Sequence, residues 1–265
     1  MMMNPIVTSV RISIRPLQTA FVPFQHGEYL RAIVYETMKP LWNNLHDTNS
    51  PKPFSINPLQ FPPGMKRERK TFVVPPHVHG YFDVVVFGNE MTVAVKKLSS
   101  LKRKTVKIGD SRFKVVSTSI KFLTEETLEA DGNQYSKLKV SFKTPLFFIE
   151  NGYGKEFRIH ELPLERILRT PFRIYNMISK NSLNEDLLSQ ECKNVRLVDK
   201  QSSLKPLRFP VHNDDKQIIY TGHKGNLVFK GEINGTISKL VRLANWVNVG
   251  HGRTIGLGKI HARMY

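Results

Sequence analysis

Two hydrophobic periods alternate along the first half of the chain, and their order constrains the fold more than any other feature. Residues 5–15 alternate apolar and polar side chains, which is typical of a half-buried strand. Residues 26–38 instead repeat apolar side chains at helical spacing. The following elements are a β-branched strand at 81–87, a helix at 89–101 and a strand at 112–122, with room for one more strand near Phe72. This is the order of a split βαβ, or ferredoxin-like, module.

Prolines interrupt this pattern after the first helix. Pro40 lacks an amide donor, so it should end or kink the helix, and it could start a second short helix through Leu45. The tail NSPKPFSINPL that follows contains three prolines and is predicted to be irregular.

The second half repeats the element order of the first. Its predicted elements are a strand at 137–149, helices at 162–179 (interrupted at Pro171) and 183–192, β-rich segments at 193–198 and 217–232, a helix around 237–247 and a strand at 255–264. The turn-rich segment ADGNQ at 130–134 separates the halves. We therefore expect an α+β chain of two tandem ferredoxin-like domains, residues 1–130 and 131–265, with a glycine-rich loop near its C-terminal end.

Charge narrows the class of partner. Forty Lys and Arg against 22 Asp and Glu give a net charge of +18 and a pI near 10, beyond what solubility requires. This favours a polyanionic partner, although charge alone does not separate RNA from DNA or from an anionic membrane surface. No apolar run reaches the roughly 18 residues that span a bilayer, and the N-terminus lacks signal-peptide features, so we expect a cytoplasmic protein without membrane insertion. Cys192 is the single cysteine and is interpreted as a packing residue.

The segment VGHGRTIGLGKI follows the last predicted helix and contains a cluster of glycines and cations: Gly250, Gly252, Arg253, Gly256, Gly258 and Lys259. Glycine lets successive amides approach a phosphate closely, and the cations add charge, so this is a candidate RNA-binding loop. A tight turn into the last strand is the alternative. The glycine spacing and position exclude a dinucleotide fingerprint, and a Walker A loop fails because Arg253 and Ile260 stand where glycine and Ser or Thr are needed.

A second basic feature lies between residues 96 and 121, where nine Lys or Arg accompany one acid, Asp110. We predict a groove for an RNA backbone, with Lys102, Arg103 and Lys104 as contacts. A solvated charged face is the alternative.

His46 lies near two residues of the types that RNA cleavage requires. Tyr35 lies eleven residues before it and Lys52 six after, so a base or acid, a phenol and a cation share one region. Cleavage through the 2′-hydroxyl needs a base, an acid for the leaving oxygen and a cation for the phosphorane, without a metal. An unbroken helix would separate Tyr35 from His46 by about 16 Å, so the chain must turn at Pro40. From spacing alone, His46 is more often an ordinary solvent-facing residue.

No metal site or cofactor is expected. His77 and His79 could hold a metal from one strand face, but no Asp, Glu or Cys stands at a supporting spacing.

Three segments in the same order carry a resemblance to a known family: FVPFQHGEYLRAIVY at 21–35, LHDTNSPKPFSINPL at 45–59 and NVGHGRTIGLGKI at 248–260. Together they resemble the CRISPR-associated endoribonuclease family of the RAMP superfamily, which processes repeat transcripts into guide RNAs. The last segment is similar to the glycine-rich loop of that family. The first two are similar to its helix and loop with catalytic Tyr, His and Lys, which fall here on Tyr35, His46 and Lys52.

The resemblance implies two ferredoxin-like domains and metal-independent cleavage of CRISPR repeat RNA (pre-crRNA) on the 3′ side of the repeat's stem or binding segment. The expected ends are a 5′-hydroxyl and a 2′,3′-cyclic phosphate. We further expect a monomer or homodimer, with a guide-RNA effector complex as another partner. Two alternatives remain at this point: a noncatalytic RNA-binding subunit of such a complex, and a basic scaffold protein of the ribosome.

Overall fold

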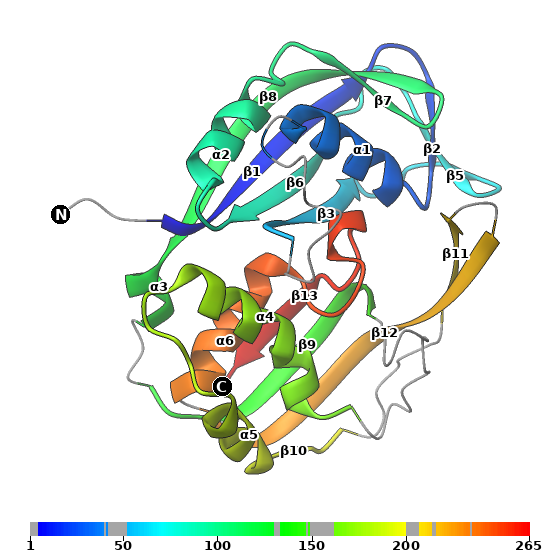
Figure 1. The fold of residues 1–265 in the computed structure, drawn as a ribbon. Coiled ribbons are helices and arrows are strands. Elements are labelled where there is room, and N and C mark those ends of the chain that lie inside the picture. Colours follow the sequence, from blue (N-terminus) through cyan, green and yellow to red (C-terminus); the bar gives the residue numbers. More distant parts are fainter. Residues whose placement is uncertain are drawn as a thin grey trace. The chain divides into compact units, whose positions relative to one another are not determined.

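The chain forms two compact units in a computed structural model that describes residues 5–39, 41, 52–129, 133–146, 148, 162–199, 207–213, 216–233 and 235–265 (Figure 1). Unit 1 comprises Met1–Leu123 and Thr254–Gly256, and unit 2 comprises Thr124–Arg253 and Leu257–Tyr265. The sequence places the division at residues 130 and 131, whereas the units divide after Leu123. Three residues of the glycine-rich loop also belong to unit 1.

Unit 1 is built on a five-stranded sheet in the order β3-β6-β1-β8-β7 (Figure 1). Its elements are β1 (Pro5–Pro16), α1 (Gly27–Met38), β3 (Phe54–Gln60), β6 (Gly80–Phe87), α2 (Met91–Ser99), β7 (Thr105–Ile108) and β8 (Ser111–Thr124). Alternate residues of β1 and β6, such as Ile12 and Val84, share one buried cluster with Leu30 of α1 and Leu98 of α2. Each such side chain stabilises the fold by roughly 1.5–3 kcal/mol. This burial fixes α1 on the sheet, and the predicted order of these strands and helices is confirmed.

A second, three-stranded sheet in unit 1 has the order β2-β5-β4. It consists of β2 (Ala20–Pro23), β4 (Arg67–Glu68) and β5 (Thr71–Val74), all paired antiparallel. The strand predicted near Phe72 is therefore present, as β5, but it lies in this small sheet.

The prediction that the proline-rich tail is irregular was wrong for residues 54–60. They form β3, which pairs with β6 from Phe54 opposite Val86 to Gln60 opposite Tyr81. Pro58 falls in the register shift between Asn57 and Gln60, and β3 is an edge strand. An edge position and a bulge are the places where a strand tolerates a residue without an amide hydrogen.

Unit 2 has a sheet in the order β10-β12-β9-β13, with β11 paired to β12 (Figure 1). Its elements are α3 (Glu125–Glu129), β9 (Tyr135–Leu146), α4 (Leu164–Ile178), α5 (Glu185–Lys193), β10 (Val195–Leu197), β11 (Leu207–Asn213), β12 (Lys216–Ile233), α6 (Gly235–Val247), a 3₁₀ helix (Arg253–Ile255) and β13 (Ile260–Met264). The last strand begins five residues later than predicted because the 3₁₀ turn intervenes. Cys192 lies on the buried face of α5, where burial raises the pKa of its thiol to about 12.

The predicted interruption at Pro171 was also wrong, because α4 runs through this proline. An interior proline costs a helix roughly 3 kcal/mol. Helix α4 packs against α6, and its buried residues include Ile167, Phe172 and Ile174. Several buried side chains of this size outweigh the lost hydrogen bond.

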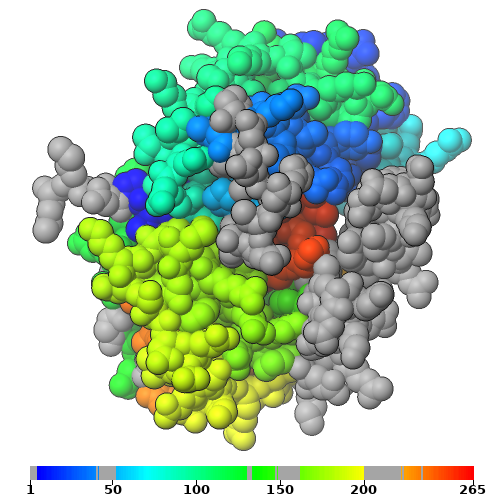
Figure 2. All heavy atoms as spheres, in the orientation of Figure 1, coloured from blue at the N-terminus to red at the C-terminus, as the bar shows by residue number. Residues whose placement is uncertain are grey.

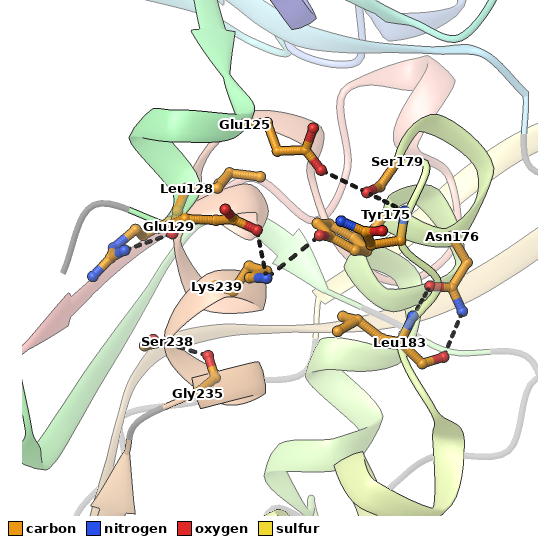
Figure 3. A network of polar contacts seen from close by, with 12 residues as sticks. Glu125, Leu128, Glu129, Tyr175, Asn176, Ser179, Leu183, Gly235, Ser238 and Lys239 are labelled. Carbon is orange, nitrogen blue, oxygen red and sulfur yellow. Dashed lines mark hydrogen bonds and ion pairs between the residues drawn. The ribbon is translucent and has the colours of Figure 1, made fainter. Parts of the chain in front are cut away.

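Polar contacts join α3 to α4 and α6 in unit 2 (Figure 3). Lys239 Nζ lies 3.1 Å from Glu129 Oε1 and donates to Tyr175 Oη at 3.4 Å. Ser179 Oγ donates to Glu125 Oε1 at 2.8 Å. Tyr175 is fully buried, so its hydroxyl needs such a partner. Within the described part of the chain, no helix is long and apolar enough to cross a membrane.

Candidate active site

Tyr35 and Lys52, which lie 17 residues apart in the chain, meet in unit 1. Lys52 Nζ donates to Tyr35 Oη at 2.9 Å, and the ammonium lies 5.5 Å from the centre of the tyrosine ring. The ring also packs edge-on against Phe54, with centroids 5.6 Å apart. Both side chains are half-buried. A cation and a phenol are thus held together while remaining partly open to solvent.

Core packing positions this pair. Tyr35 follows Val34 on α1, and Val34 is fully buried against the sheet. Lys52 stands two residues before Phe54, the buried first residue of β3. The pairing of Phe54 with Val86 on β6 therefore fixes the chain next to Lys52. The edge strand that sequence analysis took for an irregular tail is the element that brings Lys52 to Tyr35.

His46 and Pro40 lie outside the described residues. Helix α1 ends at Met38, and the amide of Leu41 donates to the Met38 carbonyl at 2.7 Å in a turn. The helix that carries Tyr35 therefore ends before residue 46.

All four glycines of the glycine-rich loop have left-handed backbone angles: Gly250, Gly252, Gly256 and Gly258 have φ of 72°, 77°, 84° and 70°. Other residues avoid this region at a cost of roughly 1–2 kcal/mol. Gly258 is also sterically required, because a Cβ atom there would lie 1.7 Å from the Val249 carbonyl oxygen. Around Gly256 the nearest atoms would be 3.5 Å away. Gly258 is therefore required for the fold, whereas a side chain at Gly256 would have space around it.

Both cations of this loop interact with other residues of the protein or are buried by them. Arg253 is buried, and burial lowers the pKa of its guanidinium to about 10. Lys259 Nζ donates to the Asn245 carbonyl near the end of α6 at 2.6 Å. A lysine at this position also complements the negative end of the helix dipole.

The basic stretch of residues 96–121 borders a groove on unit 1 of about 780 Å³, lined by α1, α2 and β7. Three lysines line it, Lys97, Lys104 and Lys107, together with Tyr29 and Glu36. Of the three predicted RNA contacts, only Lys104 is in this lining. Lys102 and Arg103 lie in the turn after α2 and are exposed. The groove is thus basic, and its lysines come from a wider stretch than the predicted trio. Among the described residues, no group of three or more His, Cys, Asp or Glu could hold a metal ion.

Known proteins share this architecture. Residues 140–260 match the family model described as CRISPR-associated endoribonuclease Cas6. A Cas6 protein in a product complex has a TM-score of 0.68 and 17% identity, covering 97% of this chain and 99% of its own. Residues 140–260 are thus similar to the Cas6 family, and the whole chain shares the fold of solved Cas6 proteins.

Two further solved structures are similar over nearly their full length. Cas6 of Thermus thermophilus has a TM-score of 0.65 and 14% identity, covering 98% of this chain and 99% of its own. The protein of a Cas6-related gene from Pyrococcus furiosus has a TM-score of 0.62 and 14% identity, covering 97% and 98%. No curated protein sequence matches this chain. The family-model match includes the glycine-rich loop and does not extend to Tyr35, His46 or Lys52.

Sequence reasoning missed two residues at the start of α1. His26 is buried; its Nδ1 lies 3.0 Å from the Pro23 carbonyl oxygen, and its Nε2 accepts from the Leu59 amide at 2.9 Å. Nδ1 must therefore carry the hydrogen, and the imidazole is neutral. Burial lowers the pKa of His26 and favours the same state.

Gly27 is the second missed residue. A Cβ atom on it would lie 1.9 Å from the Ile255 carbonyl oxygen, so only glycine admits the tip of the glycine-rich loop here. The sequence did contain a signal for this pair, because neither His26 nor Gly27 is a favoured helix former although both stand at the start of a helix.

Proposed function

We propose that this protein is an endoribonuclease that cleaves CRISPR repeat RNA into guide RNAs by metal-independent attack of a 2′-hydroxyl. The observation that carries the proposal is the 2.9 Å contact between Lys52 Nζ and Tyr35 Oη on a half-buried surface of unit 1. The match to the Cas6 endoribonuclease family supports the same activity. Solved Cas6 proteins with similar folds include a product complex and a substrate-mimic complex.

The proposed reaction divides two proton transfers and one charge among three residues. The 2′-oxygen attacks the adjacent phosphorus, its proton passes to a base, and the P–O5′ bond breaks as the 5′-oxygen takes a proton from an acid. The products carry a 2′,3′-cyclic phosphate and a 5′-hydroxyl. We assign one proton transfer to His46 and the other to Tyr35, whose hydroxyl accepts from Lys52 and can still donate its own hydrogen. Lys52 stabilises the negative charge of the phosphorane.

RNA binding is assigned to the glycine-rich loop and the basic residues of unit 1. We propose that amides around Gly250, Gly252, Gly256 and Gly258, with Arg253 and Lys259 beside them, bind phosphates, and that Lys102, Arg103 and Lys104 contact the RNA backbone. The net charge of +18 supports a polyanionic partner.

We infer that each unit is a ferredoxin-like domain. The strand paths β3-β6-β1-β8 in unit 1 and β10-β12-β9-β13 in unit 2 correspond, because in each path the strand that comes first along the chain lies between the third and the last. We further propose that the protein acts in the cytoplasm as a monomer or homodimer and passes its product to a guide-RNA effector complex.

The deciding experiment is cleavage of repeat RNA in EDTA, followed on a denaturing gel. We expect cutting, and we expect Tyr35→Phe to slow it roughly 10²- to 10⁴-fold, as for loss of a proton-transfer group. Tyr265→Phe is the matched control, because this tyrosine is 56% exposed in the last residue of the chain. Binding without cutting by the unmodified protein would instead identify a noncatalytic RNA-binding subunit.

A further inference from the structure

The hairpin of β4 and β5 gathers cations at its tip in unit 1. Residues 66–70, KRERK, contain four cations and one acid, and all five are exposed. The strands pair Arg67 with Phe72 and Glu68 with Thr71, which leaves Arg69 and Lys70 in the turn. In Figure 2 the cyan side chains of this region protrude at the right edge of unit 1. The cationic tip is therefore accessible to a ligand.

Aromatic rings lie directly beside these cations. Phe24, which follows β2, packs edge-on against Phe72 with ring centroids 4.6 Å apart. The Arg67 guanidinium lies 5.9 Å from the centre of the Phe24 ring and 5.6 Å from that of Phe72. Phe24 is nevertheless 40% exposed, and Phe21 on β2 is 52% exposed. The rings thus keep free surface despite the contact with Arg67.

The turn itself adds an independent observation. Arg69 has φ of 50°, in the left-handed region that residues other than glycine avoid for steric reasons. Gly or Asn would make the same turn at lower cost. The strained position holds a guanidinium at the outermost point of the hairpin, beside Lys70. A turn that served only to connect two strands would not need this charge.

Exposed rings next to cations match the chemistry of unpaired RNA. Bases stack on aromatic side chains and on guanidinium planes, while Lys and Arg bind the flanking phosphates. A packing role accounts for the contact between Phe24 and Phe72 but not for the exposed ring surface or the charged turn. A membrane surface also attracts exposed aromatics and cations, so the experiment must separate the two ligands.

We propose that the β4–β5 hairpin and the end of β2 form a stacking platform for unpaired nucleotides of the RNA. Phe24 and Arg67 contact a base, and Arg69 and Lys70 hold neighbouring phosphates. The inference rests on the proposed function only in taking RNA as the ligand, and it does not depend on cleavage.

The test uses the full chain and a single-stranded oligoadenylate of about 12 nucleotides that contains 2-aminopurine, at about 0.2 M salt. Stacking is worth about 1–3 kcal/mol per base, so Phe24→Ala should weaken binding about 5- to 150-fold and reduce the quenching of 2-aminopurine. Phe24→Trp should retain both. Phe24→Leu, which keeps an apolar side chain without a π-face, should resemble Phe24→Ala. Leu187→Ala, at a 45% exposed site on α5, is the matched control and should bind like the unmodified protein.

The double variant Arg69→Gln, Lys70→Gln tests the phosphate contacts. Loss of two contacts with a single strand should lower the slope of log affinity against log salt by about 1.4. Unchanged affinity, quenching and salt slope in Phe24→Ala and in the double variant would overturn the proposal. So would a loss confined to binding of phosphatidylserine vesicles. If the unmodified protein fails to cut repeat RNA but Phe24→Ala still loses binding to the oligonucleotide, the platform stands and the nuclease proposal fails. If Phe24→Ala binds normally and the unmodified protein cuts, the nuclease proposal stands and the platform fails.

Discussion

Two lysine–tyrosine contacts in this protein have similar chemistry and different surroundings. In unit 1, Lys52 Nζ donates to Tyr35 Oη at 2.9 Å, and both side chains are half-buried. In unit 2, Lys239 Nζ donates to Tyr175 Oη at 3.4 Å, Tyr175 is fully buried, and Glu129 forms an ion pair with the lysine (Figure 3). The same two residue types therefore stand in different environments.

Access to solvent separates the two tyrosines. A hydroxyl at a fully buried residue cannot reach an RNA phosphate, and Glu129 locally neutralises the charge of Lys239. The contact in unit 2 joins three helices. The contact in unit 1 joins the end of α1 to the chain before β3 and leaves the phenol partly open. A lysine–tyrosine contact by itself thus does not identify a nuclease site.

The largest expected effect is on the cleavage rate, which should fall on substitution of Lys52 but not of Lys239. Lys52→Ala should slow cleavage of repeat RNA about 10²- to 10³-fold, as for loss of a group that stabilises charge in the transition state. Lys239→Ala should leave the rate per folded molecule unchanged. Single-turnover rates measure both, with thermal unfolding as the check on folding. Equal losses in the two variants would break the distinction.

The glycine-rich loop allows the same separation within one segment. Gly258→Ala should destabilise the protein by more than about 3 kcal/mol, because its Cβ would lie 1.7 Å from the Val249 carbonyl oxygen. Gly256→Ala should cost only the left-handed strain of roughly 1–2 kcal/mol. Denaturant unfolding of the two variants measures the difference. Similar stabilities would show that the loop adapts around Gly258.

A third prediction concerns His26, which directly precedes α1. Burial lowers its pKa, so the unfolded imidazole takes up a proton at a pH where the folded one does not. Stability from His26 is therefore complete above about pH 6.5 and is lost as the pH falls below it, by at most about 1.4 kcal/mol per pH unit. His26→Gln should show a flatter dependence between pH 5 and 7. Parallel curves for the two proteins would exclude this role.

The smallest effect is expected at the ion pair of unit 2. Glu129→Gln should lower stability by about 0.2–1 kcal/mol, because the pair is partly exposed and screened by water. Glu126→Gln, an exposed neighbour on α3, should change nothing measurable. Cleavage should be unaffected in both. A cleavage defect in Glu129→Gln alone would place the unit 2 network in the function after all.

Periodicity predicted the elements that bury a regular face. The strands β1, β6 and β8 and the helices α1, α2 and α6 lie close to their predicted positions, because alternating or helical apolar spacing is itself the pattern of burial. Two predictions that rested on prolines were wrong. Pro58 sits in an edge strand and Pro171 in a helix, and in both places neighbouring burial or a bulge compensates for the missing amide hydrogen.

The sequence by itself predicted a polyanionic partner and determined the order of the elements and the residue types of the candidate site, since charge, periodicity and side-chain chemistry are local properties. Only the tertiary structure decided which of these residues meet. Tyr35 and Lys52 come together because β3 pairs with β6, and a pairing between residues distant in the chain leaves no local signal. Likewise, nothing in the sequence distinguishes Lys52 from Lys239. Only the structure shows that the tyrosine beside Lys239 is fully buried and that Glu129 forms an ion pair with this lysine.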